Sequence, residues 1–254
     1  MNPASTCTKR RSRAWPAWRA ALALCLTPAG AALAQSASLT AYTVPVAPWT
    51  FPGDPARGIA PQYLRYLFDK AQIEVHLDTL PYLRVVNGLR DGSNTAAILI
   101  PDAERDTFAL RLCNATVIRP GVLYKKSRFR LNDIAALAGL AVGEQHGSHA
   151  LDKLAAVPNV RHDKIESIDQ GLRMLEVDRL DATFVSSPGV EVLMENYGLS
   201  PADYAWLEVD QNPVVVYISR KSPLAADKAA LQRLKDVCEG TGRAVMTRLM
   251  REYK

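Results

Sequence analysis

Much of what marks an enzyme or a membrane protein is missing from this 254-residue sequence. After residue 34, no stretch approaches the run of about 20 apolar residues that crosses a membrane. His146, His149 and His162 lie near one another, but no second pair of ligands follows at the spacing of a zinc site. The sequence also lacks a phosphate-binding loop and an evident nucleophile–base pair. We therefore expect neither a metal nor a cofactor, and we predict no catalytic residue.

Acidic residues are absent from residues 1–34, which contain five basic residues. An apolar run from Ala20 to Leu26 follows the basic residues, and small residues then lead to Ala34. This order is typical of a secretory signal peptide cleaved after Ala34, and the apolar run is too short for a membrane anchor. We expect the mature chain in the periplasm of a Gram-negative cell. A lipid anchor at Cys25 and twin-arginine export are weaker alternatives.

The mature chain has little net charge. The whole sequence contains 31 Lys and Arg against 26 Asp and Glu. Because the signal peptide holds five of the basic residues and none of the acidic ones, 26 of each sign remain. The basic excess belongs to the export segment, so it gives no reason to expect a nucleic acid or an acidic membrane as partner.

Only two cysteines, Cys113 and Cys238, remain in the mature chain. An even number of cysteines in an oxidising compartment favours a disulfide between them. Two buried free thiols would fit the same residues, because cysteine often packs as a small hydrophobic side chain.

Short apolar strands alternate with amphipathic helices along the first part of the mature chain. We expect strands at residues 38–44, 73–77 and 95–100, and helices at 58–71 and 81–91. This alternation predicts an α/β sheet with parallel strands.

The same alternation begins again near residue 140. The predicted strands and helices follow in the order strand 140–142, helix 150–156, strand 159–162, helix 167–175, strand 180–185 and helix 188–197. Two β-rich stretches, 117–124 and 209–219, flank this second unit, as the crossing strands of a hinge would. A helical segment at 223–253 completes the chain.

These patterns predict two α/β lobes joined by two crossing strands, with a ligand cleft between the lobes. The first lobe is discontinuous, because the C-terminal helices return to it. The predicted boundaries are signal peptide 1–34, first lobe 35–117, hinge strand 118–124, second lobe 125–208, hinge strand 209–217 and first-lobe helices 218–254.

Five short motifs occur in a set order along the mature chain. They are Gly58 before an amphipathic helix, Leu89-Arg-Asp-Gly92, Leu137-Ala-Gly-Leu-Ala-Val-Gly143, Gln145-His-Gly-Ser148 and Leu175-Glu-Val-Asp-Arg-Leu-Asp-Ala182. In this order they resemble bacterial extracellular solute-binding protein family 3, the periplasmic polar amino acid-binding proteins with the periplasmic-binding-protein type II fold. The last motif is similar to the family's L-x-x-G-R-x-D-A, with Asp178 in place of its Gly, which indicates a divergent member.

The resemblance implies a monomer that captures a small carboxylate-bearing solute, amino acid-like or an organic acid, in the cleft between the lobes. It also implies transient docking to the permease of an inner-membrane ABC transporter.

The resemblance places a carboxylate-binding arginine at Arg105, just after a predicted strand. Guanidinium suits this role because its planar fork forms two parallel, charge-assisted hydrogen bonds; the alternative is an exposed loop arginine. Ser148, which follows Gly147 at a helix start, would offer its hydroxyl and free N–H groups to the same anion, or simply cap the helix. Arg84, near another helix start, is a second candidate for the cation or a surface residue.

Trp49 and Phe51, in the loop after the first strand, could stack on the solute or cover it, unless one of them packs in the core. Relatives place a carboxylate after the strand that ends the last motif, where it pairs with the α-ammonium of an amino acid; Ser186 stands there in this sequence. Because an unpaired buried charge is costly, an organic acid or an unusual amino acid becomes credible. Asp210 or Glu144 could supply a replacement carboxylate.

Two other functions remain open. A periplasmic cyclohexadienyl dehydratase branch has a similar scaffold and would need a titratable group over the ligand, for which Glu144, His146 and His149 are the candidates. The second alternative is a sensory module that signals when the ligand closes the cleft.

Overall fold

The computed structural model describes residues 39–146 and 152–253. The predicted signal peptide, residues 1–34, lies outside the described residues, as do Gly147, Ser148 and His149. Within these two ranges, no helix combines the length and the apolar character that crossing a membrane demands.

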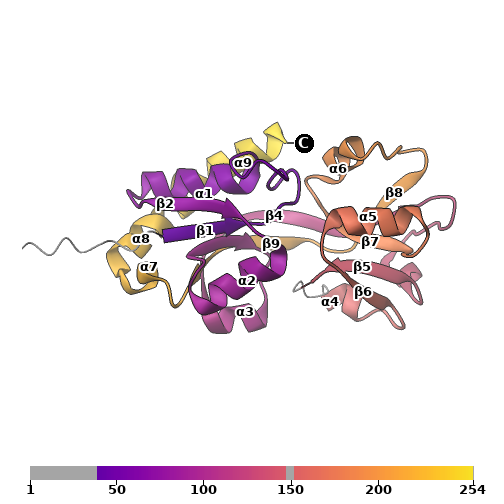
Figure 1. Ribbon diagram of the computed structural model, residues 1–254, viewed down its shortest axis with the longest axis horizontal. Coiled ribbons are helices and arrows are strands. Elements are labelled where there is room, and N and C mark those ends of the chain that lie inside the picture. Colours follow the sequence, from indigo (N-terminus) through magenta and orange to yellow (C-terminus); the bar gives the residue numbers. More distant parts are fainter. Residues whose placement is uncertain (1–38, 147–151, 254) are drawn as a thin grey trace, which may run out of the picture. The chain divides into compact units, whose positions relative to one another are not determined.

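The first part of the chain forms the α/β unit that its periodicity predicts (Figure 1). Strand β1 (Leu39–Thr43) pairs in parallel with β2 (Val75–Thr79). Helix α1 (Ile59–Lys70) connects them and buries its apolar side. Helix α2 (Tyr82–Asp91) then leads to the short buried strand β3 (Ala96–Leu99).

Strand β3 departs from the predicted parallel arrangement. It pairs antiparallel with β9 (Asn212–Ser219), a strand near the end of the chain. Among the described residues, it forms no strand ladder with β1 or β2, which make a separate two-stranded sheet. A short helix, α3 (Ala103–Phe108), follows β3 and is capped by the Asp102 carboxylate, which accepts a hydrogen bond from the Arg105 amide. This helix was not predicted.

Strand β4 (Ala109–Lys125) is long enough to belong to two sheets. Its first part, to Ile118, pairs antiparallel with β9, and its second part, from Arg119, pairs with β7 (Ala182–Ser187) and β8 (Tyr204–Glu208). The strand order β3-β9-β4-β7-β5-β6, in which β5 is Ala141–Gln145 and β6 is Arg161–Ile165, is therefore continuous, and β4 carries the chain from one lobe to the other.

The second part of the chain forms a parallel core. After a 3₁₀ turn (Ile134–Leu137), strand β5 (Ala141–Gln145) lies between β6 (Arg161–Ile165) and β7, and it pairs in parallel with both. Helix α5 (Ile168–Glu176), capped by Ser167, and helix α6 (Val190–Asn196) lie on one face of this sheet, and α4 (Asp152–Ala155) lies on the other (Figure 1).

Each lobe has its own cores, although residues 37–254 form one compact unit. In the first lobe, α1 and the C-terminal helices cover one core, which includes Tyr63 and Leu67, while α2 covers another around Leu89 and Tyr217. In the second lobe, separate clusters lie beside α4 and beside α5 and α6. Because β4 pairs with β9 in the first lobe and with β7 and β8 in the second, the chain has an α/β fold of two lobes joined by two crossing strands.

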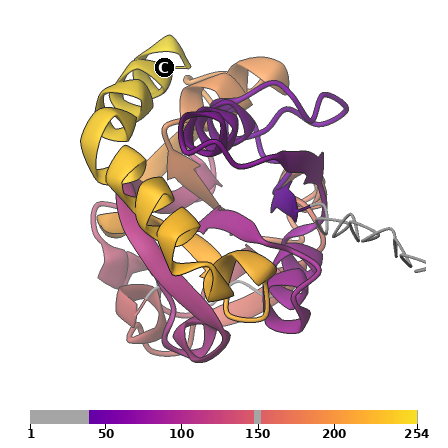
Figure 2. The same ribbon diagram turned by 90° about the vertical axis from the view of Figure 1, so that its left-hand side faces the viewer.

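The C-terminal helices return to the first lobe, where Figures 1 and 2 show them beside α1. They are α7 (Pro223–Ala226), α8 (Lys228–Val237) and α9 (Arg243–Glu252), with a π-helical turn (Cys238–Gly242) between the last two. That turn interrupts the helical segment predicted at 223–253. Cys238, in the turn, forms a disulfide with Cys113 of β4, their Cα atoms being 6.4 Å apart, so the predicted bridge is confirmed.

Candidate ligand-binding site

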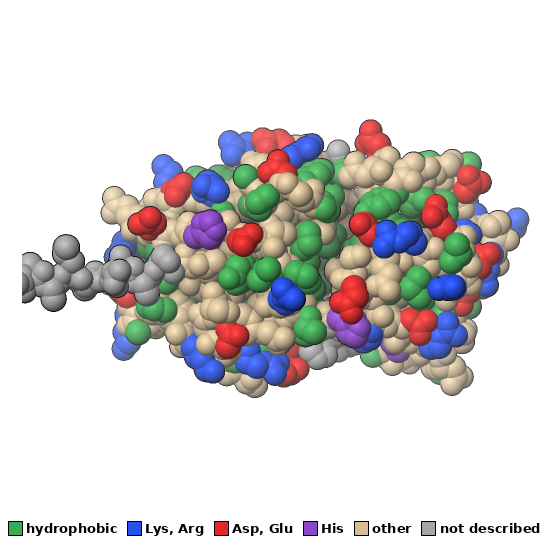
Figure 3. Space-filling model, in the orientation of Figure 1, with side chains coloured by type: hydrophobic (Ala, Val, Ile, Leu, Met, Phe, Trp, Pro, Cys, Tyr) green, Lys and Arg blue, Asp and Glu red, His purple; other side chains and the backbone are tan. Residues whose placement is uncertain are grey.

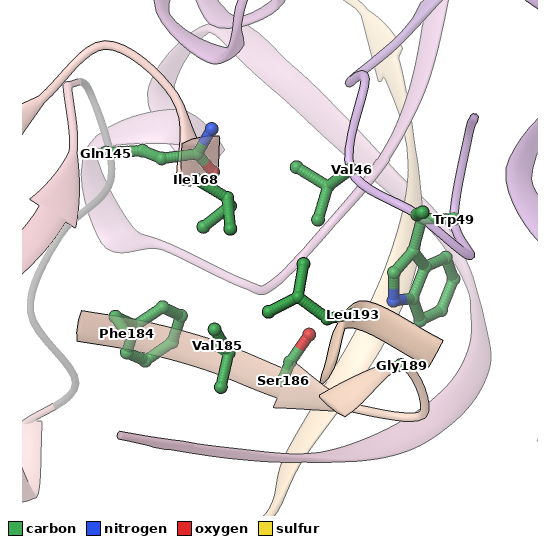
Figure 4. Close-up of a pocket in the computed structure, with 10 residues that line it drawn as sticks. Val46, Trp49, Gln145, Ile168, Phe184, Val185, Ser186, Gly189 and Leu193 are labelled. Atoms are coloured by element: carbon green, nitrogen blue, oxygen red, sulfur yellow. The ribbon is translucent and has the colours of Figure 1, made fainter. Parts of the chain in front are cut away.

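A pocket of about 60 Å³ lies between the loop that follows β1 and the second lobe (Figure 4). Its walls come from that loop, the end of β5, the first residue of α5, β7 and the start of α6. The lining residues are Val46, Ala47, Trp49, Gln145, Ile168, Phe184, Val185, Ser186, Gly189 and Leu193. Figure 4 shows Val46 and Trp49 across the space from the three residues of β7. Both lobes thus contribute to one small cavity.

The loop that carries Trp49 is tied to the beginning of α1. The carbonyl oxygens of Pro48 and Trp49 accept hydrogen bonds from the amides of Ile59 and Ala60, at 3.0 and 2.8 Å. These bonds satisfy amide groups that have no partner within the helix at its N-terminus. A Cβ atom on Gly58 would lie 2.5 Å from the Trp49 oxygen, and the φ angle there is +130°, so glycine allows this close approach. The local sequence therefore holds Trp49 against the pocket.

The opposite wall is the end of β7, where Ser186 lies opposite Pro120 of β4. The next turn brings Gly189 against the first lobe: a Cβ atom there would lie 2.3 Å from Cδ of Pro48. At this point only a glycine leaves room for the loop of the other lobe. Trp49 and Ser186, both expected near the ligand, therefore line the same pocket.

Arg105 lies among the first-lobe residues and is not part of the pocket lining. Its side chain is 2% exposed; one terminal nitrogen donates to the carbonyl of Ile100 and the other donates to the hydroxyl of Tyr82, at 3.1 Å. The guanidinium carbon lies 5.4 Å from the centre of the Tyr217 ring. The Nε atom is buried without a hydrogen-bond partner. Arg105 is therefore held by its own lobe and keeps one unsatisfied donor.

Two tyrosines around Arg105 have shifted acidities. Burial raises the pKa of Tyr82, although the neighbouring Arg105 partly opposes this shift. Burial also raises the pKa of Tyr217, whose hydroxyl donates a hydrogen bond to Asp106 at 3.0 Å. Both phenols thus stay protonated near neutral pH and act as neutral partners beside the guanidinium.

No protein-family model matches the sequence, and a comparison with curated proteins also found no match. Solved structures are similar. The substrate binding protein of an amino acid ABC transporter is 15% identical, with a TM-score of 0.69 over 85% of this chain and 98% of that chain. The arginine-, lysine-, histidine-binding protein ArtJ from Geobacillus stearothermophilus is 14% identical, with a TM-score of 0.71 over 85% and 94%. The chain has the periplasmic-binding-protein type II fold.

A solved periplasmic domain is also similar to this chain. The periplasmic VFT2 domain of Bordetella pertussis BvgS is 13% identical to this chain, with a TM-score of 0.69 over 85% of this chain and 93% of that domain. At these identities the comparisons establish the periplasmic-binding-protein type II fold and nothing finer.

Within this fold, Arg84 and Phe51, two further candidates predicted from the sequence, do not line the pocket. Arg84 is exposed in the first turn of α2. Phe51 is half-buried near the C-terminus, with its ring centre 5.8 Å from that of Tyr253 and with Arg57 stacked on it at 4.0 Å. Gly147 and Ser148 lie outside the described residues.

Both candidate replacement carboxylates already have partners. Glu144 is 2% exposed, and its two oxygens contact Nδ1 of His162 at 2.8 Å and Nζ of Lys164 at 3.0 Å. Asp210 forms an ion pair with Lys153. Burial raises the pKa of Asp210, but the hydrogen bonds from Lys153 and the Gln211 amide, together with the charge of Lys153, outweigh burial, so the pKa is below its ordinary value. Neither carboxylate lines the pocket.

Most of the lining residues were missed in the sequence, although a general rule points to them. Val46 follows β1, Gln145 ends β5, and Phe184 to Ser186 lie in the last part of β7. Ligands of open α/β sheets bind beyond the carboxyl ends of the strands. Applying this rule to each predicted strand would have selected these segments. Across residues 39–146 and 152–253, no group of three or more His, Cys, Asp or Glu side chains is placed to hold a metal ion.

Proposed function

We propose that the mature chain is a periplasmic binding protein that captures a small carboxylate-bearing solute between its lobes. The pocket carries this proposal, because its walls come from the Trp49 loop of one lobe and from β5, α5, β7 and α6 of the other. A solute that touches both walls interacts more strongly with the closed state than with an open one. That difference in affinity is what a ligand-driven closure requires.

Arg105 would bind the solute carboxylate, and Ser148 would approach the same anion from the second lobe. In support, the Arg105 guanidinium is buried with its Nε unsatisfied. A carboxylate in reach of this group would form charge-assisted hydrogen bonds and satisfy that donor. The ring of Trp49 and the hydroxyl of Ser186 would contact the remainder of the solute.

Transport is the role we favour. The similar structures include the substrate binding protein of an amino acid ABC transporter, so we infer that this chain delivers its solute to an ABC permease. Catalysis is less well supported, because the described residues that line the pocket include no acid, base or nucleophilic thiol, and His162 and Lys164 already contact the two oxygens of Glu144. A sensory module that signals when the ligand closes the cleft is the other alternative.

The test is to identify what the protein carries. Mature protein purified without denaturation and released by acid should yield one small carboxylate by mass spectrometry. The same compound, added to ligand-free protein, should bind at one site per chain in calorimetry and shift the emission of Trp49, measured in a Trp206→Phe background. A copurified solute without a carboxylate, or turnover of the compound to a new product, would contradict the proposal.

A further inference from the structure

We propose that the solute bears no ammonium group and presents a short, uncharged, mainly apolar part to the pocket, as a short aliphatic or hydroxy monocarboxylic acid does. This inference rests on the proposed function, in which the carboxylate is bound outside the pocket lining by Arg105. It names the chemical class of the remainder, which the lining residues contact.

The lining itself is uncharged. Seven of its ten residues have apolar side chains, and Gly189 adds none; the two polar ones are Gln145 and Ser186. Every lining residue is buried or half-buried. A hydroxyl or keto oxygen on the solute can hydrogen-bond to the Ser186 hydroxyl or the Gln145 amide. Elsewhere on the pocket wall, the hydrophobic side chains favour an apolar part of the solute over a charged group. Figure 3 shows hydrophobic side chains gathered along the hollow between the two lobes.

Carboxylates close to the lining in sequence do not neutralise the pocket. Glu144 directly precedes Gln145, but His162 and Lys164 occupy its two oxygens and it is buried on its other sides. Asp169 and Glu191 follow lining segments on α5 and α6, and neither lines the pocket. An ammonium group in this cavity would be buried with no counter-charge from any described residue of its lining. Even at the lower end of its usual cost, burying such an unpaired charge raises the dissociation constant about thirtyfold.

The size of the cavity limits the apolar part. A cavity needs a volume of about 10–15 Å³ to hold a single water, and the pocket has a volume of about 60 Å³. The space therefore suits a group of a few heavy atoms, of the size of an ethyl or isopropyl group, and not a long or aromatic side chain.

Calorimetry with compounds of equal carbon skeleton tests this inference. One set is propanoate, L-lactate and L-alanine; the other is 3-methylbutanoate, 2-hydroxy-3-methylbutanoate and L-valine. For the mature wild-type protein, freed of copurified ligand, we expect at least one acid of a set to bind about thirtyfold or more tightly than the amino acid of that set.

Ser186→Asp places a carboxylate on the wall of the pocket and should reverse the preference. The amino acid should then bind at least about tenfold more tightly than it binds wild type, and the acids more weakly. Ser186→Asn introduces a side chain of nearly the same size as aspartate but without its charge, and it should not improve amino acid binding. Ser187→Asp adds the same charge one residue further along β7, outside the lining, and should leave the preference as in wild type. Thermal melts establish that each variant is folded.

Equal or tighter binding of L-alanine or L-valine by the wild type overturns the inference and leaves carboxylate capture intact. Failure of all six compounds also overturns it, because the set offers both the carboxylate and the short uncharged part. The proposed function fails separately, if mass spectrometry finds no copurified carboxylate.

Discussion

At the scale of single residues, Arg105 and Ser186 of the proposed site differ in how firmly they are held. Arg105 is almost completely buried, and its terminal nitrogens bind Ile100 and Tyr82. Ser186 is half-buried at the end of a strand and lines an apolar cavity. The arginine is therefore prepared as a fixed cation, because little side-chain freedom is left to be lost on binding.

We predict that Arg105→Gln weakens binding of the copurified solute by about 2–5 kcal/mol, because a buried charge-assisted contact is lost. Arg65→Gln, the same substitution at an exposed arginine of α1, should change the affinity by less than about 0.5 kcal/mol. Calorimetry at one pH and one salt concentration measures both. An Arg105→Gln protein that melts like wild type and binds with wild-type affinity would rule out the anchor.

Tyr63 gives a prediction on pH. Its side chain is fully buried and its hydroxyl lies 3.4 Å from Sγ of Cys238. Burial, assisted by the nearby Tyr66, raises the pKa of Tyr63 to about 12. Since the pKa in the folded state exceeds the value of about 10 in the unfolded chain, this group stabilises the fold fully below pH 10. That contribution is lost as the pH rises from 10 towards 12.

Urea unfolding between pH 9 and 11.5 should therefore show stability falling more steeply in the wild type than in Tyr63→Phe. Tyr66→Phe removes a tyrosine with an exposed hydrogen bond to Thr241 and should reduce the slope only slightly, because Tyr66 contributes less than burial to the raised pKa of Tyr63. Identical slopes for wild type and Tyr63→Phe would show that the hydroxyl does not titrate as expected.

At the scale of elements, the loop after β1 and the turn after β7 join the two lobes beside the pocket. Gly189 has a φ angle of +128°, and a Cβ atom there would collide with Pro48 of the other lobe. We predict that Gly189→Ala weakens solute binding by about tenfold or more, because the closed state loses stability relative to the open one.

Gly139→Ala is the matched control for this prediction. Gly139 also has a positive φ angle, +79°, but nothing lies within 4 Å of an added Cβ atom. It should therefore lower stability through backbone strain without changing the affinity. Calorimetry measures the change in affinity of each variant, and thermal melts measure the change in stability. Equal solute affinities for Gly189→Ala and Gly139→Ala would argue against closure at Gly189.

At the scale of the whole molecule, the disulfide ties the end of the chain to the first lobe. Cys113 and Cys238 are 125 residues apart in sequence, and the second lobe lies between them. Cross-linking so long a loop restricts the unfolded chain. We predict that reduction lowers the free energy of unfolding by about 2–5 kcal/mol. Guanidinium denaturation with and without dithiothreitol measures the loss, and Cys113→Ala/Cys238→Ala should not respond to the reductant.

The order of helices and strands follows largely from local patterns. Helices α1, α2 and α5 occur where apolar residues recur with the helical period, and β7 occurs where a β-rich run was predicted. Strands β2 and β6 are displaced by about two residues, and α3 and β8 were not predicted at all. The residues of α3 and β8 lack a clear period. Strand β8 forms by pairing with β4, and α3 packs against α2 and β4.

The sequence by itself determined the α/β rhythm, the restart near residue 140 and the return of the C-terminal helices, because these depend on periodicity and on turn residues. It left the two cysteines either bridged or free, and the structure shows the disulfide. Signal cleavage and the lobe boundaries remain predictions. Only the tertiary structure decided that β3 pairs with β9, that Trp49 and Ser186 share a pocket, and that Arg105 is buried against Tyr82 and Tyr217. The physical reason is that strand partners and cavity walls are chosen by packing between segments far apart in the chain, which no local pattern encodes.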